Sequence, residues 1–181
     1  MEEAKKIVTP LSEDAVWRLR AGDRVLISGK IYSARDIAHK RLCAAIDAGE
    51  ELPFELSGSV VYFVGPTPAR QGAVIGAAGP TTSSRMDGFS PKLLESGLKG
   101  MIGKGYRGDC VRKALKKYCA VHFATIGGAG ALLSRHIVSS KVIAYDDLGP
   151  EAVRQMEVED FPAVVAYDCY GGSVYDKEKK Q

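Results

Sequence analysis

A run of side-chain hydroxyls that ends in a guanidinium is the first feature of this sequence that could do chemistry. Residues 81–85 read TTSSR and lie in a stretch rich in glycine and proline. Lys104 stands between Gly103 and Gly105, which allow the backbone to come close to a ligand. Arg35 is expected in the first turn of a helix, where backbone N–H groups and a guanidinium favour a carboxylate or phosphate. These residues predict a site for a small anion.

The same residues also allow a purely structural interpretation. The stretch 65–89, crowded with glycine and proline, could be a rigid connector, and the cations could form ordinary surface ion pairs. Loops of this length in compact domains are usually functional or disordered. The apolar strands expected on both sides favour a functional loop.

Two nucleotide-binding motifs are absent. Between Gly97 and Lys104 there is one residue too many for a Walker loop, and Gly105 stands where that motif needs Ser or Thr. After the glycines at 128 and 130, Leu133 occupies the place of the third glycine of the dinucleotide fingerprint. The anion is therefore not expected to be a nucleotide held by either motif.

Histidines and cysteines give no sign of a metal site. His39 lies next to Lys40 and Arg41 and is expected to face solvent, whereas His122, in an apolar strand, is expected to be a structural histidine. The cysteine spacing fits neither a zinc site nor a compact disulfide framework. We expect no metal ligand in this chain and four buried free thiols, at Cys43, Cys110, Cys119 and Cys169.

Length and composition are those of an ordinary globular protein. The chain has 181 residues, 45% of them apolar and 26% charged, which predicts one compact domain over residues 1–181. A net charge of +3, from 25 basic and 22 acidic residues, is too small to argue for nucleic acid or a membrane surface. No apolar stretch has the length of a membrane span, and the first residues lack the apolar core of a signal peptide, so a cytoplasmic location is expected.

Apolar periodicity, together with residues typical of helix and strand ends, predicts the strands and helices that would position these side chains. Strands are predicted at 24–32, 59–65, 100–103, 120–126, 141–145 and 163–167. Helices are predicted after a Ser33 cap up to Gly49, from Ser90, from Asp109, through Leu132 and Leu133, and over 151–156. Because strands and helices alternate, the predicted class is α/β.

Several blocks of the sequence resemble the β subunit, or C-terminal domain, of class I fumarate hydratases, the iron–sulfur fumarate/tartrate hydro-lyases. The blocks are GPTTSSRMD at 79–87, PKLLE at 91–95, GLKGMIGKG at 97–105, SARDIAHKR at 33–41, YDDLGPEA at 145–152 and VEDFPA at 158–163. The resemblance spans nearly the whole chain. It implies a swivelling β/β/α domain and the reversible addition of water to fumarate, which gives (S)-malate.

The resemblance also implies a role for each matching side chain. Arg35 and Arg85 would each hold a substrate carboxylate. Thr81 would be the base that moves the carbon-bound proton, and the adjacent Thr82 cannot be separated from it by chemistry. Lys104 would bind the substrate or tune the threonine. Two arginines and a lysine suit the two negative charges of a dicarboxylate.

Cofactor and partner follow from the same resemblance. The family uses a [4Fe–4S] cluster, with one iron open to the substrate as Lewis acid, and its cysteine ligands belong to the α subunit or the N-terminal domain. This chain would then be incomplete alone. It would form a heterotetramer with the α subunit and possible homodimers without it. Two alternatives remain open, namely an L(+)-tartrate dehydratase β subunit and a non-catalytic module that binds dicarboxylates and regulates a partner.

Overall fold

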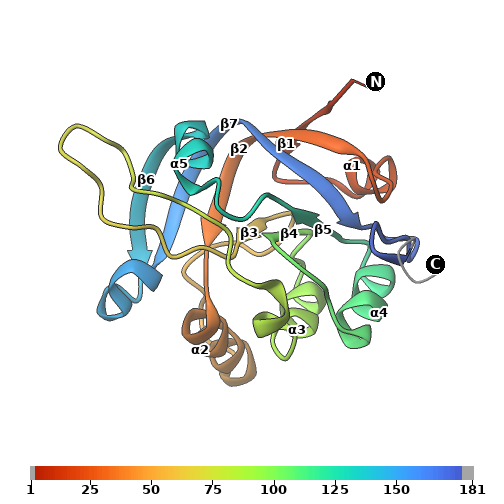
Figure 1. Ribbon diagram of the computed structural model, residues 1–181. Coiled ribbons are helices and arrows are strands. Elements are labelled where there is room, and N and C mark those ends of the chain that lie inside the picture. The colour runs from red at the N-terminus through yellow and green to blue at the C-terminus, as the bar shows by residue number, and fades with distance from the viewer. Residues whose placement is uncertain (1–2, 177–181) are drawn as a thin grey trace.

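The computed structural model describes residues 3–176 (Figure 1). Its strands are β1 (Lys5–Thr9), β2 (Arg24–Ser33), β3 (Val60–Tyr62), β4 (Gly100–Gly103), β5 (Val121–Ala124), β6 (Ile137–Ala144) and β7 (Val153–Tyr167). Its α-helices are α1 (Glu13–Trp17), α2 (Asp36–Ala48), α3 (Ser90–Glu95), α4 (Asp109–Lys117) and α5 (Gly130–Leu133). Three short 3₁₀ helices are η1 (Ser83–Met86), η2 (Ser134–His136) and η3 (Asp146–Glu151).

The strands form one sheet that closes on itself. Their order is β1-β2-β3-β4-β5-β7-β6, and an additional pairing joins β2 to β7. Strands β2, β3, β4, β5 and β7 therefore make a closed five-stranded barrel, which β1 and β6 extend. Neighbours from β1 to β5 are parallel, whereas β7 runs antiparallel to β2, β5 and β6. The class is thus mixed α and β, as predicted, with strands dominant.

Alternation along the strands separates two cores. On β3, Val60 and Tyr62 point into the cluster inside the barrel, and Val61 points into the cluster outside it. The outer cluster is covered by α2, α3 and α4, which lie in a row below the strands in Figure 1. Helices α1 and α5 instead contribute Val16 and Leu133 to the cluster inside the barrel.

Helix α2 confirms one prediction and corrects another. The helix ends at Gly49, which adopts a left-handed φ of 67° as its C-cap. His39, predicted to face solvent, is fully buried. It shares the inward face of the helix with Ala38 and Leu42, at the spacing of one helical turn, and packs edge-on against the ring of Phe63. The charged neighbours in the sequence misled that prediction.

The predicted helix at 151–156 is wrong, because Val153–Met156 begin β7. Arg154 pairs with β2 on one side and with β6 on the other. Buried side chains at Val153 and Met156 imitate helical spacing. Pairing with β2 and with β6 nevertheless holds this backbone in an extended conformation. The predicted strand at 163–167 is therefore only the last part of a strand of 15 residues. The same long pairing starts β6 at Ile137, before the predicted residue 141.

The prediction of four buried free thiols needs qualification. All four cysteines are free, but only Cys43 is buried, while Cys110 is exposed and the other two are half-buried. Burial and then the neighbouring Cys119 raise the pKa of the Cys169 thiol to about 11. No helix among residues 3–176 has the length and apolar character needed to cross a membrane.

Candidate functional site

The predicted site residues gather at the carboxyl ends of the parallel strands. Because β2, β3, β4 and β5 run in the same direction, the segments that follow them emerge at one edge of the barrel. Arg35 follows β2, the segment with Thr81 follows β3, Lys104 follows β4 and Gly127 follows β5. We call this edge the rim. Sheet topology thus brings together residues that are far apart in the sequence.

Thr81 and Thr82 are fixed to the rim through their backbone. The Thr81 N–H donates to the Phe63 carbonyl at 2.7 Å, and the Thr81 carbonyl accepts from the Lys104 N–H at 3.3 Å. The Ser83 N–H then donates to the Lys104 carbonyl at 2.8 Å. Thr82 therefore forms a parallel bridge with Lys104. Thr82 and Lys104 are exposed and Thr81 is half-buried, so a ligand can reach all three.

Lys104 extends across the rim towards the end of β5. A Cβ added at Gly127 would lie 3.5 Å from the Lys104 Nζ, so the ammonium rests against that backbone. Gly105, with a φ of 79°, turns the chain away directly after the lysine. That Gly103 and Gly105 let the backbone come close to a ligand stays a prediction, and the space at Gly103 is taken by the Ser83 hydroxyl.

The two arginines meet through a carboxylate that the sequence analysis did not single out. The Arg85 Nε donates to Asp36 Oδ1 at 2.8 Å, and Arg35 Nη2 lies 3.6 Å from Asp36 Oδ2. Arg35 is the N-cap residue of α2, so it lies one residue before the first turn, in which the sequence analysis expected it. The Asp36 carboxylate therefore sets the spacing between the two guanidiniums, and its signal in the sequence was its place beside Arg35 in the block at 33–41.

A second carboxylate holds the other side of Arg35. The Arg35 Nη1 lies 3.0 Å from Glu151 Oε1, and a Cβ at Gly65 would touch both side chains. Two buried atoms in this group, Arg35 Nε and Asp36 Oδ2, have no hydrogen-bond partner. Buried polar atoms without partners are uncommon in folded proteins and call for an explanation. A ligand that donates to the carboxylate or accepts from the guanidinium would satisfy them.

Charges at the rim are more balanced than the sequence suggested. The cations of Arg35 and Arg85 are matched by the anions of Asp36 and Glu151, so Lys104 supplies the excess positive charge. Within the described residues, no hydrogen bond or ion pair joins the arginine pair to Lys104. The rim therefore has two parts, an arginine pair and a threonine–lysine part, linked by the chain from 81 to 85.

His122 is a structural histidine, as predicted, and it lies directly below the rim. Its ring is fully buried and contacts Ser83 and Arg107, at 3.1 Å each. Burial, and then the charge of Arg107, lower the pKa of His122 well below its ordinary value. Arg107, whose side chain is 0% exposed, was missed in the sequence because nothing there marks it as buried.

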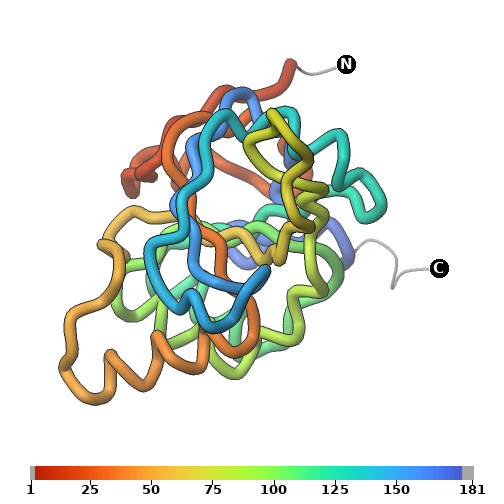
Figure 2. Tube along the Cα trace, turned by 90° about the vertical axis from the view of Figure 1, so that its left-hand side faces the viewer, coloured from red at the N-terminus to blue at the C-terminus, as the bar shows by residue number. Residues whose placement is uncertain are grey.

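The glycine- and proline-rich segment between β3 and η1 leaves the barrel as a long loop. Its base is closed by two bonds between Thr67 and Ala77, of 3.0 and 2.8 Å. Figure 2 shows the loop beside the segment around Gly130, whose carbonyl accepts from the Ala78 N–H at 3.0 Å. A cavity of about 270 Å³ lies between this loop, Pro150 and Arg154. The loop therefore borders the rim on the side of Glu151.

The described residues do not fit an iron–sulfur cluster. Irons of such clusters are usually held by cysteine thiolates. Among residues 3–176, no group of three or more His, Cys, Asp or Glu side chains could hold a metal ion.

Comparison with known proteins relates this chain to one family. Residues 2–178 match the family model described as "Fumarase C-terminus". The chain is 36% identical to the "Putative L(+)-tartrate dehydratase subunit beta" of Methanocaldococcus jannaschii, over 94% of this chain and 91% of that protein. It is 37% identical to "Fumarate hydratase 2" of Leishmania major, over 86% of this chain but 28% of that protein. It is 35% identical to "Fumarate hydratase class I, aerobic" of Escherichia coli, over 96% and 31% respectively.

Proposed function

The chain belongs to the fumarase C-terminal family, and from this premise we propose that it supplies the substrate-binding side of a hydro-lyase for four-carbon dicarboxylates. The leading reaction is the reversible hydration of fumarate to (S)-malate. One observation carries this proposal, namely that the rim places two linked guanidiniums, two threonine hydroxyls and one lysine at the same edge of the barrel.

Arg35 and Arg85 hold the carboxylates of the substrate. A guanidinium binds a planar carboxylate with two parallel hydrogen bonds, which fixes direction as well as position. Arg85 donates to Asp36 through Nε, and its side chain is 51% exposed, so its outer nitrogens can receive a carboxylate. Arg35 is held by Glu151 and Asp36 and binds substrate in competition with them. Holding both ends of a dicarboxylate places its double bond for reaction.

Thr81 moves the carbon-bound proton, and Thr82 remains the alternative. A threonine hydroxyl is a weak base, so its deprotonated form must be stabilised by positive charge. Lys104 provides that charge from the neighbouring backbone, to which both threonines are bonded or bridged. The lysine also attracts the anionic substrate. Thr81 and Lys104 are thus the proposed catalytic residues, and Thr82 contributes to substrate binding.

We assign the [4Fe–4S] cluster and its Lewis-acid chemistry to an α subunit, since residues 3–176 hold no fitting donor set. One similar protein is named as a subunit beta, and this chain spans about a third of the class I fumarate hydratases that it matches. We therefore propose one swivelling β/β/α domain over residues 1–181. It works in the cytoplasm within a heterotetramer, is inactive without the α subunit, and can pair with itself when alone.

Tartrate is the second candidate substrate. The protein of Methanocaldococcus jannaschii whose length this chain nearly matches carries L(+)-tartrate dehydratase in its name. Tartrate and fumarate are both four-carbon dicarboxylates, so the arginine pair suits either. A regulatory module that binds dicarboxylates without turnover is the non-enzymatic alternative.

An anaerobic assay with both substrates tests the proposal. The full chain is assayed alone and after co-expression with a cluster-bearing α subunit, and loss of fumarate absorbance is followed. We expect activity only in the mixture, with fumarate. Activity with L-tartrate alone would establish the second candidate. No turnover of either substrate, with the cluster shown to be intact, would leave the regulatory module.

A further inference from the structure

Three buried polar side chains and one half-buried carboxylate form a continuous series below the rim. Asp87 Oδ1 accepts from Arg107 Nε at 2.7 Å, and Arg107 Nη1 contacts His122 Nδ1 at 3.1 Å. His122 Nε2 in turn contacts Ser83 Oγ at 3.1 Å. We call Asp87, Arg107, His122 and Ser83 the buried polar chain. No role follows for it from the proposed binding of substrate.

Ser83 connects the buried polar chain to the residues that are proposed to react. It directly follows Thr82, and its N–H donates to the Lys104 carbonyl. A Cβ at Gly103 would lie 2.2 Å from the Ser83 Oγ, so the hydroxyl occupies the space that this glycine leaves. The position of Ser83 therefore fixes the backbone of Thr82 and Lys104 together.

The proton positions on His122 follow from its partners. A guanidinium only donates hydrogen bonds, so Nδ1 of His122 must accept from Arg107. The proton of the neutral ring then lies on Nε2, which donates to the Ser83 Oγ. The other groups around the ring are Phe63 and Tyr167, with ring centroids 6.1 and 6.0 Å away. The neutral ring thus has one orientation that satisfies both neighbours.

The other end of the buried polar chain holds the end of η1. Asp87 directly follows this helix, and its second oxygen accepts from the Gly108 N–H at 2.7 Å. Arg107 also donates to Ser90 Oγ at 2.6 Å, and its backbone N–H donates to the Tyr167 hydroxyl at 3.0 Å. Helix η1, which carries Arg85, is therefore fastened at its first residue and just beyond its last.

We propose that His122 and Arg107 are positioning residues for the rim, which hold both ends of η1 so that Thr81, Thr82 and Arg85 keep a fixed relation to Lys104. This deepens the proposed function and rests on it for the reaction. Stability alone explains such a group poorly, because a buried ion pair is often no more stabilising than apolar residues of the same volume. A rigid second layer behind reacting side chains preserves catalytic geometry.

Nuclear magnetic resonance of the full chain, without a partner subunit, tests the contacts of His122 with Ser83 and Arg107. It needs no measurement of enzymatic activity. We expect His122 to show a protonated Nε2 and an unprotonated Nδ1, in a spectrum unchanged between about pH 6 and pH 8. The opposite tautomer, or a ring that titrates in this range, would overturn the proposal. This result does not depend on a partner or a substrate, so it stands apart from the test of the proposed function.

Two substitutions at one position separate positioning from packing. In His122→Gln the amide nitrogen can still donate to Ser83, whereas in His122→Asn the shorter amide reaches only towards Arg107. We expect the asparagine variant to shift the backbone amide signals of 81–85 and Lys104 and the glutamine variant to preserve them. In the assembled hydro-lyase the asparagine variant should lose about 100-fold in kcat, and the glutamine variant should recover most of it.

Equal losses of kcat in the two variants, or unchanged amide signals in His122→Asn, would show that the ring only fills space. Ser83→Ala tests the same contact where a His122 variant does not fold, since it removes one hydroxyl. It should lower kcat by about tenfold, with amide shifts confined to η1 and its two neighbouring residues. Wild-type kcat and unshifted signals in Ser83→Ala would overturn the proposal independently.

Discussion

The carboxylates of Asp36 and Asp168 differ in how fully their oxygens are satisfied by hydrogen bonds. Asp168 is 5% exposed and accepts three backbone N–H groups, from Ala21 at 2.9 Å, Tyr170 at 2.9 Å and Gly172 at 2.7 Å. Asp36 lies between two guanidiniums, and its buried Oδ2 has no hydrogen-bond partner. One carboxylate is saturated by backbone, and the other is left short of donors.

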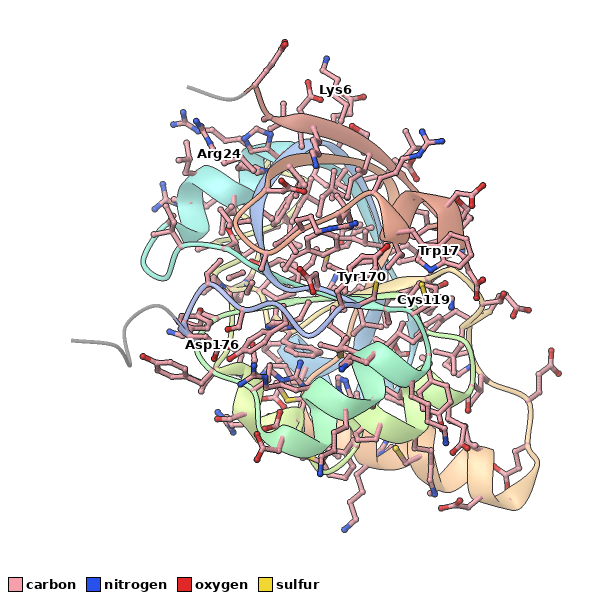
Figure 3. The ribbon with its side chains drawn as sticks, turned by 90° about the vertical axis from the view of Figure 1, so that its right-hand side faces the viewer. Lys6, Trp17, Arg24, Cys119, Tyr170 and Asp176 are labelled. Atoms are coloured by element: carbon pink, nitrogen blue, oxygen red, sulfur yellow. The ribbon has the colours of Figure 1, made fainter. Side chains whose placement is uncertain are left out.

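The difference separates a region that keeps the fold from a region prepared for a ligand. Around Asp168 the chain is closed on itself, and the Tyr170 hydroxyl donates to the Trp17 carbonyl at 3.0 Å, on the face that Figure 3 shows. At the rim, Arg35 Nε is also buried without a partner. Saturated buried groups stabilise a structure, and unsaturated ones cost free energy that a ligand can recover. Substitutions in the two regions should therefore have opposite signatures.

Replacement of Thr81 by alanine should have the largest effect and fall on activity alone. General acid–base groups typically contribute 10² to 10⁴ to a rate, so we expect kcat to fall about 10³-fold in the assembled enzyme. The fumarate KM should stay within about threefold, because the arginines still hold the carboxylates. Steady-state kinetics measure kcat and KM, and thermal unfolding of the same samples measures stability, which should not change. Thr82→Ala is the matched control and should lose far less kcat. A raised KM with normal kcat would remove Thr81 from the role of base.

Replacement of Asp168 by alanine should give the reverse pattern. Three backbone N–H groups lose their acceptor, and each buried donor left unpaired costs about 1 kcal/mol or more. We expect the free energy of unfolding to fall by about 3 kcal/mol in denaturant titration, with unchanged kcat per folded molecule. Asp176→Ala, which breaks a partly exposed ion pair with Arg112, is the control and should cost less than about 1 kcal/mol. Lost kcat in folded Asp168→Ala would end the separation of the two regions.

Sequence patterns predicted the rim better than they predicted the barrel. Strands such as 100–103 were found from local apolar runs, and the place of Lys104 at a strand end followed from them. The first ten residues of strand β7, 153–162, were not found, because they pair with parts of β2 more than a hundred positions away. Local periodicity carries no information on such pairing, and in Val153 and Met156 it imitated a helix.

Partners of the site residues were the other part that could not be predicted. Asp36 and Glu151 were both inside blocks that resemble the family, but no spacing shows that they neutralise the arginines. Arg107 is an ordinary basic residue in the sequence and a buried cation in the fold. Residue types thus indicated the chemistry, while the charge balance required three-dimensional contacts between distant segments.

Burial of His39 beside the rim makes the stability of the fold sensitive to acid. Burial lowers the pKa of His39 to about 4, and its Nδ1 contacts the Arg35 carbonyl at 2.9 Å. Between about pH 6.5 and pH 4 the unfolded chain binds a proton on this ring and the folded chain does not. Stability therefore falls as the pH falls through this window, by up to about 1.4 kcal/mol per pH unit for each such ring.

Denaturant titrations at several pH values measure this slope. In the His39→Leu variant, the number of protons taken up on unfolding in this pH window should fall by about one. The uptake that belongs to His122 should remain. Replacement of the exposed Ile37 on the same helix by leucine removes no titratable group, so this control should leave the slope as it is in the wild type. A slope that His39→Leu does not change would show that the ring binds its proton equally well in the folded and the unfolded chain.

Glu151→Gln should give the smallest effect, and its sign decides how the rim binds its substrate. The amide keeps the shape of the side chain and can still accept from Arg35, but it no longer competes with an incoming carboxylate as an anion. The pair is partly buried but still reached by solvent, and we expect its loss to change binding by about 1 kcal/mol, so the fumarate KM should fall by up to about fivefold. Asp147→Asn, on the same 3₁₀ helix but paired with Arg41, is the matched control and should leave KM unchanged. If KM rises instead, Glu151 holds Arg35 in its binding position, and the partnerless atoms at the rim then belong to a preorganised clamp rather than to a displaceable one.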